Sequence, residues 1–137
     1  ANVSAHHYSF APRFAAKYKT ESDVEIGVSP MFNFNWKNED TDYRTGNELT
    51  IDYVLNLKRN SWRYGLTGFY YIQLESDEQN GNSIANSKSE GFAVGPAIQY
   101  QFMNGKGPLF SANWMKDIYS RNRSESDTFM MSLAVKF

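Results

Sequence analysis

Apolar and polar residues alternate along most of this chain. From position 24 to position 36 every even position is apolar, while the odd positions are mostly polar or small. Successive side chains on a β-strand point to opposite faces, so this alternation predicts strands with one apolar and one polar face. The pattern recurs in seven segments, which are 8–18, 24–36, 48–58, 62–75, 92–102, 109–121 and 127–137.

One segment departs from strict alternation. In 109–121, Lys116 falls among the apolar positions 110, 112, 114 and 118. A β-bulge near this point would account for it, and so would a lysine that reaches toward water at the rim of an apolar surface. Both explanations keep the segment as a strand.

The predicted strands are unusually long. They have about ten to thirteen residues, whereas strands of soluble proteins usually have about five or six. A tilted strand needs about 9–11 residues to cross a bilayer. The longest apolar run is 69–72, which is far short of a membrane-spanning helix. The chain is therefore expected to be all-β and to contribute seven strands to an antiparallel up-and-down transmembrane barrel.

The connections between these strands alternate in length. Short turns are predicted at 19–23, 59–61 and 104–108, and long polar loops at 37–47, 76–91 and 122–126. Outer-membrane barrels have short periplasmic turns and longer outer loops. This pattern predicts that the chain starts on the outer side and ends at the periplasmic rim.

Aromatic residues are 16% of the chain, and those of the apolar faces gather near the strand ends. Two such bands are expected where a membrane barrel meets the two lipid–water interfaces. A soluble lipid-binding barrel with an aromatic core is the alternative. The interface candidates are Phe34, Trp36, Trp62, Tyr64, Tyr100 and Phe102.

The polar faces hold the residues that could line a lumen. Charges of both signs occur there, so the pattern predicts neither an anion- nor a cation-selective field. These charges could pair across strands as struts, or they could form a polar constriction. Aromatic and Met side chains on the same faces would suit hydrophobic substrates or plain packing. The candidates are Arg13, Lys17, Glu25, Met31, Asp52, Arg63, Phe69, Tyr71, Met115, Asp117 and Met130, and Arg121 is expected on the same face.

Several stretches are similar to a known family. They are 8–12, 38–48, 68–74, 94–100 and 116–122, and the stretch 41–48 reads Thr-Asp-Tyr-Arg-Thr-Gly-Asn-Glu. The chain resembles the C-terminal portion of the outer-membrane transporter family named for the meta-pathway of phenol degradation. The resemblance implies diffusion of small hydrophobic or aromatic compounds across the bacterial outer membrane. The chain end also resembles the signal read by the barrel-assembly machinery, with Phe129, Met131, Leu133, Val135 and Phe137 at alternate positions.

Seven strands conflict with the even number, at least eight, of bacterial single-chain barrels. We therefore expect residues 1–137 to be one barrel domain or the C-terminal part of one. A preceding N-terminal part or other chains would complete the barrel.

Catalysis, cofactors and metals are not expected. The chain has no Cys and a net charge of -1, which gives no support for thiolate chemistry or for nucleic-acid binding. His6 and His7 lack partners at metal-ligand spacing, and Asp40 and Asp42 are expected in a solvated loop. The acidic and amide residues of 77–86 could ligate Ca²⁺ but match no EF-hand loop.

The sequence thus predicts a diffusion channel rather than an enzyme. Its expected partners are outer-membrane lipid and lipopolysaccharide, the assembly machinery and a small hydrophobic molecule. The alternatives are a structural or adhesive barrel without a conducting lumen, and a soluble lipid-binding barrel.

Overall fold

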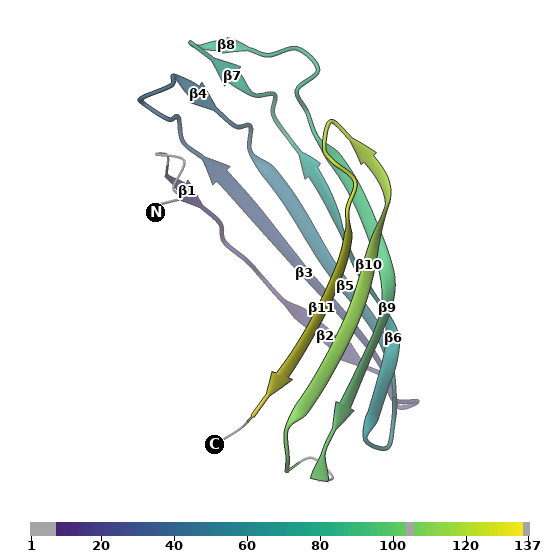
Figure 1. The fold of residues 1–137 in the computed structure, drawn as a ribbon. Helices are drawn as coiled ribbons and strands as arrows, with labels where there is room; N and C mark the ends of the chain where they lie inside the picture. Colours follow the sequence, from purple (N-terminus) through teal and green to yellow (C-terminus); the bar gives the residue numbers. More distant parts are fainter. Residues whose placement is uncertain (1–7, 104–105, 136–137) are drawn as a thin grey trace.

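The computed structural model describes residues 8–103 and 106–135. The fold is a curved antiparallel sheet with a small second sheet above one end (Figure 1). The described residues contain no helix with the length and apolar character that a membrane span would require. The prediction of an all-β, antiparallel fold is confirmed.

Each long strand of the main sheet pairs with its neighbours in the chain. The sheet runs in the order β1, β3, β5, β6, β9, β10, β11, with β2 also paired to β3. Its strands are β1 (Ser9–Phe10), β2 (Ala16–Lys19), β3 (Val24–Asn35), β5 (Glu48–Arg59), β6 (Trp62–Gln73), β9 (Glu90–Gln101), β10 (Leu109–Arg121) and β11 (Asp127–Ala134).

The first predicted strand is interrupted. Instead of one strand over 8–18, β1 and β2 flank a gap in which Arg13 makes an isolated bridge to Met31 on β3. Pro12 lies in this gap and Pro30 lies on the facing strand. Proline has no N–H to donate to a sheet ladder. The two prolines therefore reduce the number of backbone hydrogen bonds that these strands can form.

Two of the predicted long loops contain short strands. β4 (Tyr43–Arg44), β7 (Glu78–Gln79) and β8 (Asn82–Ser83) form a three-stranded sheet. The turn between β7 and β8 is Asn80-Gly81, and both residues have positive φ, at 52° and 77°. Asn-Gly favours such a turn in a two-residue hairpin. This part of the prediction, which had only loops here, is wrong.

A bulge disturbs β10 one step beyond Lys116. Asp117 pairs with Ala93, but the next paired residue is Tyr119, opposite Phe92, so Ile118 is the extra residue. An extra residue reverses which face the following side chains occupy. Lys116 stays on the apolar face, opposite Val94 and Asp127.

The bulge also corrects the prediction for Arg121. It pairs with Glu90, and Glu90 pairs with Ile72 on the apolar face of β6. Arg121 therefore belongs to the apolar face rather than to the polar one. There Glu90 forms an ion pair with Arg121 at 3.1 Å and accepts a hydrogen bond from the Tyr70 hydroxyl at 2.7 Å.

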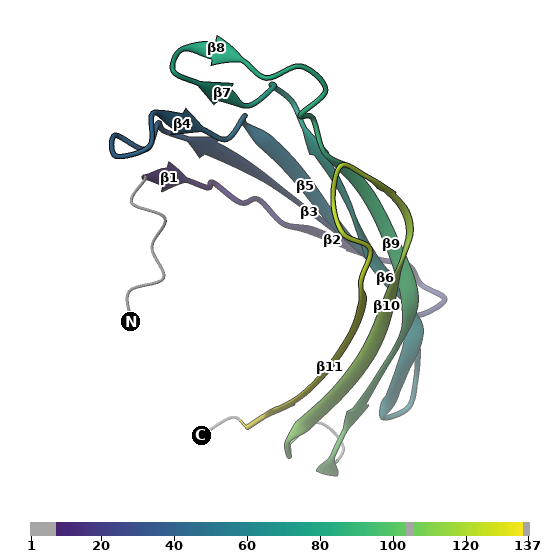
Figure 2. The same ribbon diagram turned by 45° about the horizontal axis from the view of Figure 1, so that its top comes forward.

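The main sheet curves like a trough, and its two edges stand apart (Figure 2). Within the described residues β11 pairs only with β10, and β1 and β2 pair only with β3. The curved sheet therefore does not close on itself within this part of the chain.

Candidate functional site

Burial differs sharply between the two faces of the curved sheet. Almost all of the buried strand residues lie on one face, which we call the concave face, because side chains crowd together inside a curve. Ala93 is the single buried apolar residue in the described part of the chain. The buried polar residues are Glu25, Asn35, Asn56, Gln73 and Asp117.

The opposite, convex face carries exposed apolar side chains. Leu66 is 47% exposed and Leu133 is 63% exposed. Along each strand these residues alternate with the concave set. Partners on neighbouring strands share a face, as Leu55 and Leu66 do. Other exposed members are Ile26, Val28, Ile98, Trp114, Phe129 and Met131. The sheet is therefore polar inside its curve and apolar outside.

Glu25 is the centre of an ion-pair cluster on the concave face. Its carboxylate lies 3.0 Å from Lys17 Nζ and 3.2 Å from Arg63 Nε. The three side chains come from β2, β3 and β6, and β6 is separated from β3 by β5. Because a buried carboxylate costs free energy unless it is paired, these two cations make the burial of Glu25 possible.

A second charged group lies further along the same face. Arg13 pairs with the Asp52 carboxylate and also donates from Nε to Ser29 Oγ at 2.8 Å. Nearer the loops, Glu48 accepts hydrogen bonds from Tyr71 at 2.5 Å and from the Asn33 amide at 2.8 Å. Every carboxylate in this part of the concave face is therefore held by donors from neighbouring strands.

Arg123 reaches the concave face from the connection between β10 and β11. Its guanidinium carbon lies 5.3 Å from the Phe69 ring centroid and 5.7 Å from that of Tyr71. Arg123 Nη2 also donates to Asp117 at 3.3 Å. These distances fit cation–π contacts with both rings.

Two hollows lie on this face. One, of about 390 Å³, is lined by Thr50, Asp52, Phe69, Tyr71, Ser89 and Arg123. The other, of about 360 Å³, includes Lys17, Gly27, Ser29, Asp52, Val54 and Thr67 in its lining. Small-molecule sites are typically about 300–1,000 Å³. Asp52 lines both, so the hollows are neighbours along the polar face.

The structure divides the lumen candidates among different surroundings, and Asp117 accepts hydrogen bonds from Arg123 and Ser126. Arg13, Lys17, Glu25, Asp52 and Arg63 form the ion-pair clusters, whereas Phe69 and Tyr71 form the wall of the first hollow together with Arg123. Met115 pairs with Thr128 and Met130 with Asn113, and neither lines one of the two hollows. Met31 makes the bridge to Arg13.

Sequence reasoning missed Arg123. It lies in a Ser- and Arg-rich connection without alternation, which places no side chain on a face. No local pattern in the sequence signals its contacts, because they depend on how the connection folds back over Gly91, where a Cβ would lie 2.1 Å from Arg123 Nη1.

The aromatic interface candidates cluster at the two ends of the strands. Phe34 stacks with Phe10 at the loop end, with ring centroids 6.4 Å apart. At the turn end, Tyr100 contacts Trp62 at 4.5 Å and Phe102 at 4.7 Å. Trp36 and Tyr64 are also exposed. Of the chain-end set, Phe129, Met131, Leu133 and Val135 are exposed, and Phe137 lies outside the described residues.

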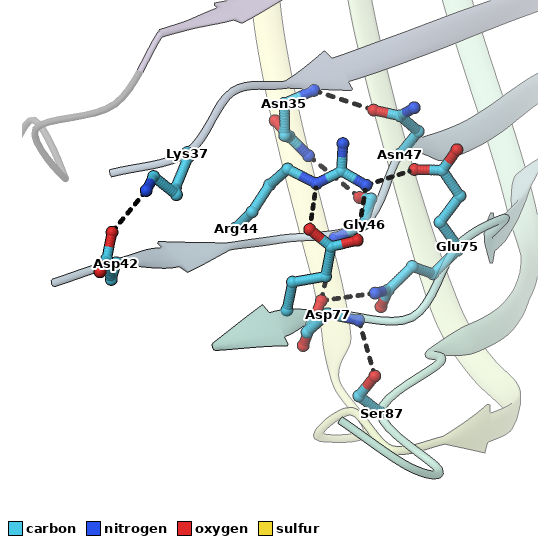
Figure 3. A network of polar contacts seen from close by, with 11 residues as sticks. Asn35, Lys37, Asp42, Arg44, Gly46, Asn47, Glu75, Asp77 and Ser87 are labelled. Atoms are coloured by element: carbon cyan, nitrogen blue, oxygen red, sulfur yellow. Dashed lines mark hydrogen bonds and ion pairs between the residues drawn. The ribbon is translucent and has the colours of Figure 1, made fainter. Parts of the chain in front are cut away.

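The Thr-Asp-Tyr-Arg-Thr-Gly-Asn-Glu stretch folds into a polar network above the sheet (Figure 3). Asp77 is its centre, because its carboxylate accepts from Tyr43 at 2.5 Å, from the Gly46 N–H at 3.0 Å and from Gln73 at 2.6 Å. Arg44 donates to Glu75 at 2.9 Å. The hydrogen bond to Asp77 raises the pKa of Tyr43 to about 12.

The same network explains the glycine of the motif. A Cβ on Gly46 would lie 2.0 Å from the Glu75 carbonyl oxygen. The backbone of Gly46 also accepts a hydrogen bond from the Asn35 side chain at 3.2 Å. The contacts of the loop motif thus hold the ends of β3, β5 and β6 together.

A protein-family comparison decides the family. The family model described as "Putative MetA-pathway of phenol degradation" matches residues 1–133. The chain belongs to this family. No curated protein and no solved structure matches it.

The acidic residues of the first long loop form local contacts. Lys37 Nζ pairs with Asp42 at 2.5 Å in an exposed loop, and the hydrogen bond with Asp42 raises the pKa of Lys37. In the described ranges, no three His, Asp or Glu residues gather closely enough to hold a metal ion. His6 and His7 lie outside the described residues.

Proposed function

We propose that this chain forms part of an outer-membrane β-barrel through which small hydrophobic or aromatic compounds diffuse. The inverted polarity of the sheet carries the proposal. A soluble protein keeps most of its apolar side chains away from water. This sheet instead buries Glu25 and Asp117 and exposes Leu66 and Leu133. Lipid against the convex face and water inside the curve would satisfy both sets of side chains.

The strand lengths and aromatic positions support the same environment. β3, β5, β6 and β9 each have 12 residues, which is enough to cross a bilayer when tilted. The Phe10–Phe34 pair and the Trp62–Tyr100 pair lie at opposite strand ends. Aromatic rings at these heights suit the two lipid–water interfaces.

The directions of the edge strands limit how a barrel could close. β1 and β2 run from the end with long connections to the end with short turns, and so does β11. Joining these edges directly would create a parallel pair. An all-antiparallel barrel containing this sheet therefore needs an odd number of further strands between them. Closure matters because unpaired backbone groups at a sheet edge are costly in lipid.

The proposal includes two partners. Outer-membrane lipid and lipopolysaccharide would cover the exposed apolar side chains of the convex face. The barrel-assembly machinery would act on β11, where Phe129, Met131 and Leu133 are exposed at alternate positions.

Uptake by vesicles tests the proposed function. Lipopolysaccharide-containing vesicles with the reconstituted protein should take up benzyl alcohol faster than empty vesicles. Thr50→Trp places a large ring in the 390 Å³ hollow and should slow this uptake. Ala112→Trp is the matched control, because Ala112 pairs with Ile98 on the convex face.

Equal uptake by protein-containing and empty vesicles would reject the transport function. It would favour a structural barrel without a conducting lumen. A protein that stays soluble and folded without detergent would instead indicate a soluble lipid-binding barrel.

A further inference from the structure

Arg123 has unused hydrogen-bonding capacity. A guanidinium carries five N–H donors, but among the described residues that of Arg123 has one acceptor, Asp117, at the long distance of 3.3 Å. Nε and Nη1 therefore have no protein acceptor in that part of the chain. The side chain is nevertheless only 24% exposed. A partly enclosed cation with free donors can receive an anionic ligand.

The segment that carries Arg123 is anchored on both sides. Ser120 Oγ donates to the Arg123 carbonyl at 2.7 Å, and the Ser126 N–H donates to Asp117 at 2.9 Å. The Asn122 amide donates to the Asn86 and Lys88 carbonyls at 2.6 and 2.8 Å. These bonds fix where Arg123 enters the concave face.

The small residues of β9 leave room for the Arg123 side chain. Gly91 and Ala93 point into the concave face beneath the path of Arg123, because they pair with Tyr71 and Phe69 respectively. A side chain at Gly91 would meet Arg123 Nη1 at 2.1 Å. Absence of a Cβ at Gly91 therefore allows the guanidinium to reach the two rings.

The nearby carboxylates do not compete for the free donors of Arg123. Asp52 is paired with Arg13, and Glu48 is bound by Tyr71 and Asn33. Asp117 accepts three hydrogen bonds, of which the shortest comes from the Ser126 N–H. The hollow thus combines two aromatic rings with a cation whose remaining donors face no protein acceptor.

We propose that the 390 Å³ hollow binds a planar aromatic carboxylate. The carboxylate accepts two parallel hydrogen bonds from Arg123, since the guanidinium fork matches that geometry. The aromatic ring of the ligand contacts Phe69 and Tyr71. This inference rests on the proposed passage of aromatic compounds along the concave face and adds the charge that the site prefers.

Binding to the purified protein in detergent tests the inference without transport. Isothermal titration calorimetry compares benzoate with benzyl alcohol, which has a similar ring but no charge. Benzoate should bind the unaltered protein more tightly. Arg123→Gln should weaken benzoate binding at least about tenfold, because charge-assisted hydrogen bonds are lost, and should leave benzyl alcohol binding nearly unchanged.

Two further variants separate recognition from folding. Arg123→Lys keeps the charge but loses the fork, so its benzoate affinity should fall between those of the unaltered protein and Arg123→Gln. Arg121→Gln is the matched control, because Arg121 lies on the convex face, and it should bind benzoate normally. Circular dichroism checks that each variant keeps its β-structure.

The outcomes distinguish this inference from the proposed function. Equal affinity for benzoate and benzyl alcohol, or equal benzoate affinity with and without Arg123, overturns the anion site while vesicle uptake can still occur. Arg123-dependent benzoate binding without vesicle uptake supports the site and rejects transport.

Discussion

One residue step along β3 separates two opposite environments. Glu25 is 6% exposed, whereas its neighbour Ile26 is 43% exposed. Burial of a carboxylate is tolerable here because Lys17 and Arg63 hold it. Exposure of an apolar side chain is favourable only against an apolar surrounding. The contrast is what the proposed position of this sheet, with lipid on one face and water on the other, would require.

The largest expected effect comes from placing a charge on the convex face. Leu66 lies midway along β6 and pairs with Leu55 on the same face. If lipid covers this face, Leu66→Arg should lower the free energy of unfolding by about 2–4 kcal/mol. Urea unfolding in lipid vesicles, followed by Trp fluorescence, measures the change.

Val54→Arg is the control on the other face. Val54 pairs with Thr67 and lines the 360 Å³ hollow, so a new guanidinium there can stay hydrated. Its cost should be much smaller than that of Leu66→Arg. Similar costs for both variants would show that the two faces do not meet different solvents.

A smaller effect is expected when the concave face loses a buried charge. Glu25→Gln keeps the shape of the side chain but weakens its contacts with Lys17 and Arg63. The unfolding free energy should fall by about 1–3 kcal/mol, because hydrogen bonds to charged groups contribute about that much. The same unfolding experiment measures it.

Asp23→Asn tests whether burial is what matters at Glu25. Asp23 pairs with Lys19 at 2.8 Å, but both side chains are well exposed. This variant should leave stability unchanged within error, because exposed ion pairs contribute little. A loss as large as that of Glu25→Gln would mean that the concave cluster has no special role.

The strands and their faces were predictable because alternation is a local property of the sequence. Glu25, Asp52 and Phe69 needed no knowledge of their neighbours to be placed on the polar face. Arg121 was misplaced because the break in alternation at Lys116 pointed to a possible bulge but not to its position. The extra residue, Ile118, is defined only by how β9 and β10 pair.

Contacts that cross the curve were not predictable. Arg63 reaches Glu25 over β5, and Arg123 reaches Phe69 over β9. Both contacts cross an intervening strand, and that of Arg123 also depends on the missing side chain at Gly91. In contrast, the hairpin at Asn80-Gly81 had a clear local signal in its residue types.

A smaller loss than that of Glu25→Gln is expected in the loop network above the sheet. Tyr43 donates to Asp77 in the loop network, and this bond raises the pKa of Tyr43 to about 12. An unfolded tyrosine titrates near pH 10. The stabilisation is therefore fully present below about pH 10 and is lost as the pH rises through 12. Tyr43→Phe should cost about 1 kcal/mol near neutral pH.

Ultraviolet absorbance titration of the unaltered protein minus Tyr43→Phe isolates this phenol. The difference should show one ionisation near pH 12. Hydrogen exchange should increase at the Gly46 amide in the variant, since that N–H shares Asp77 with Tyr43. Amides of β5 and β6 below the network should keep their protection, because their hydrogen bonds belong to the sheet ladder. A loss of protection along the whole sheet would mean that loop network and strands unfold as one unit, and that the two faces depend on the network above them.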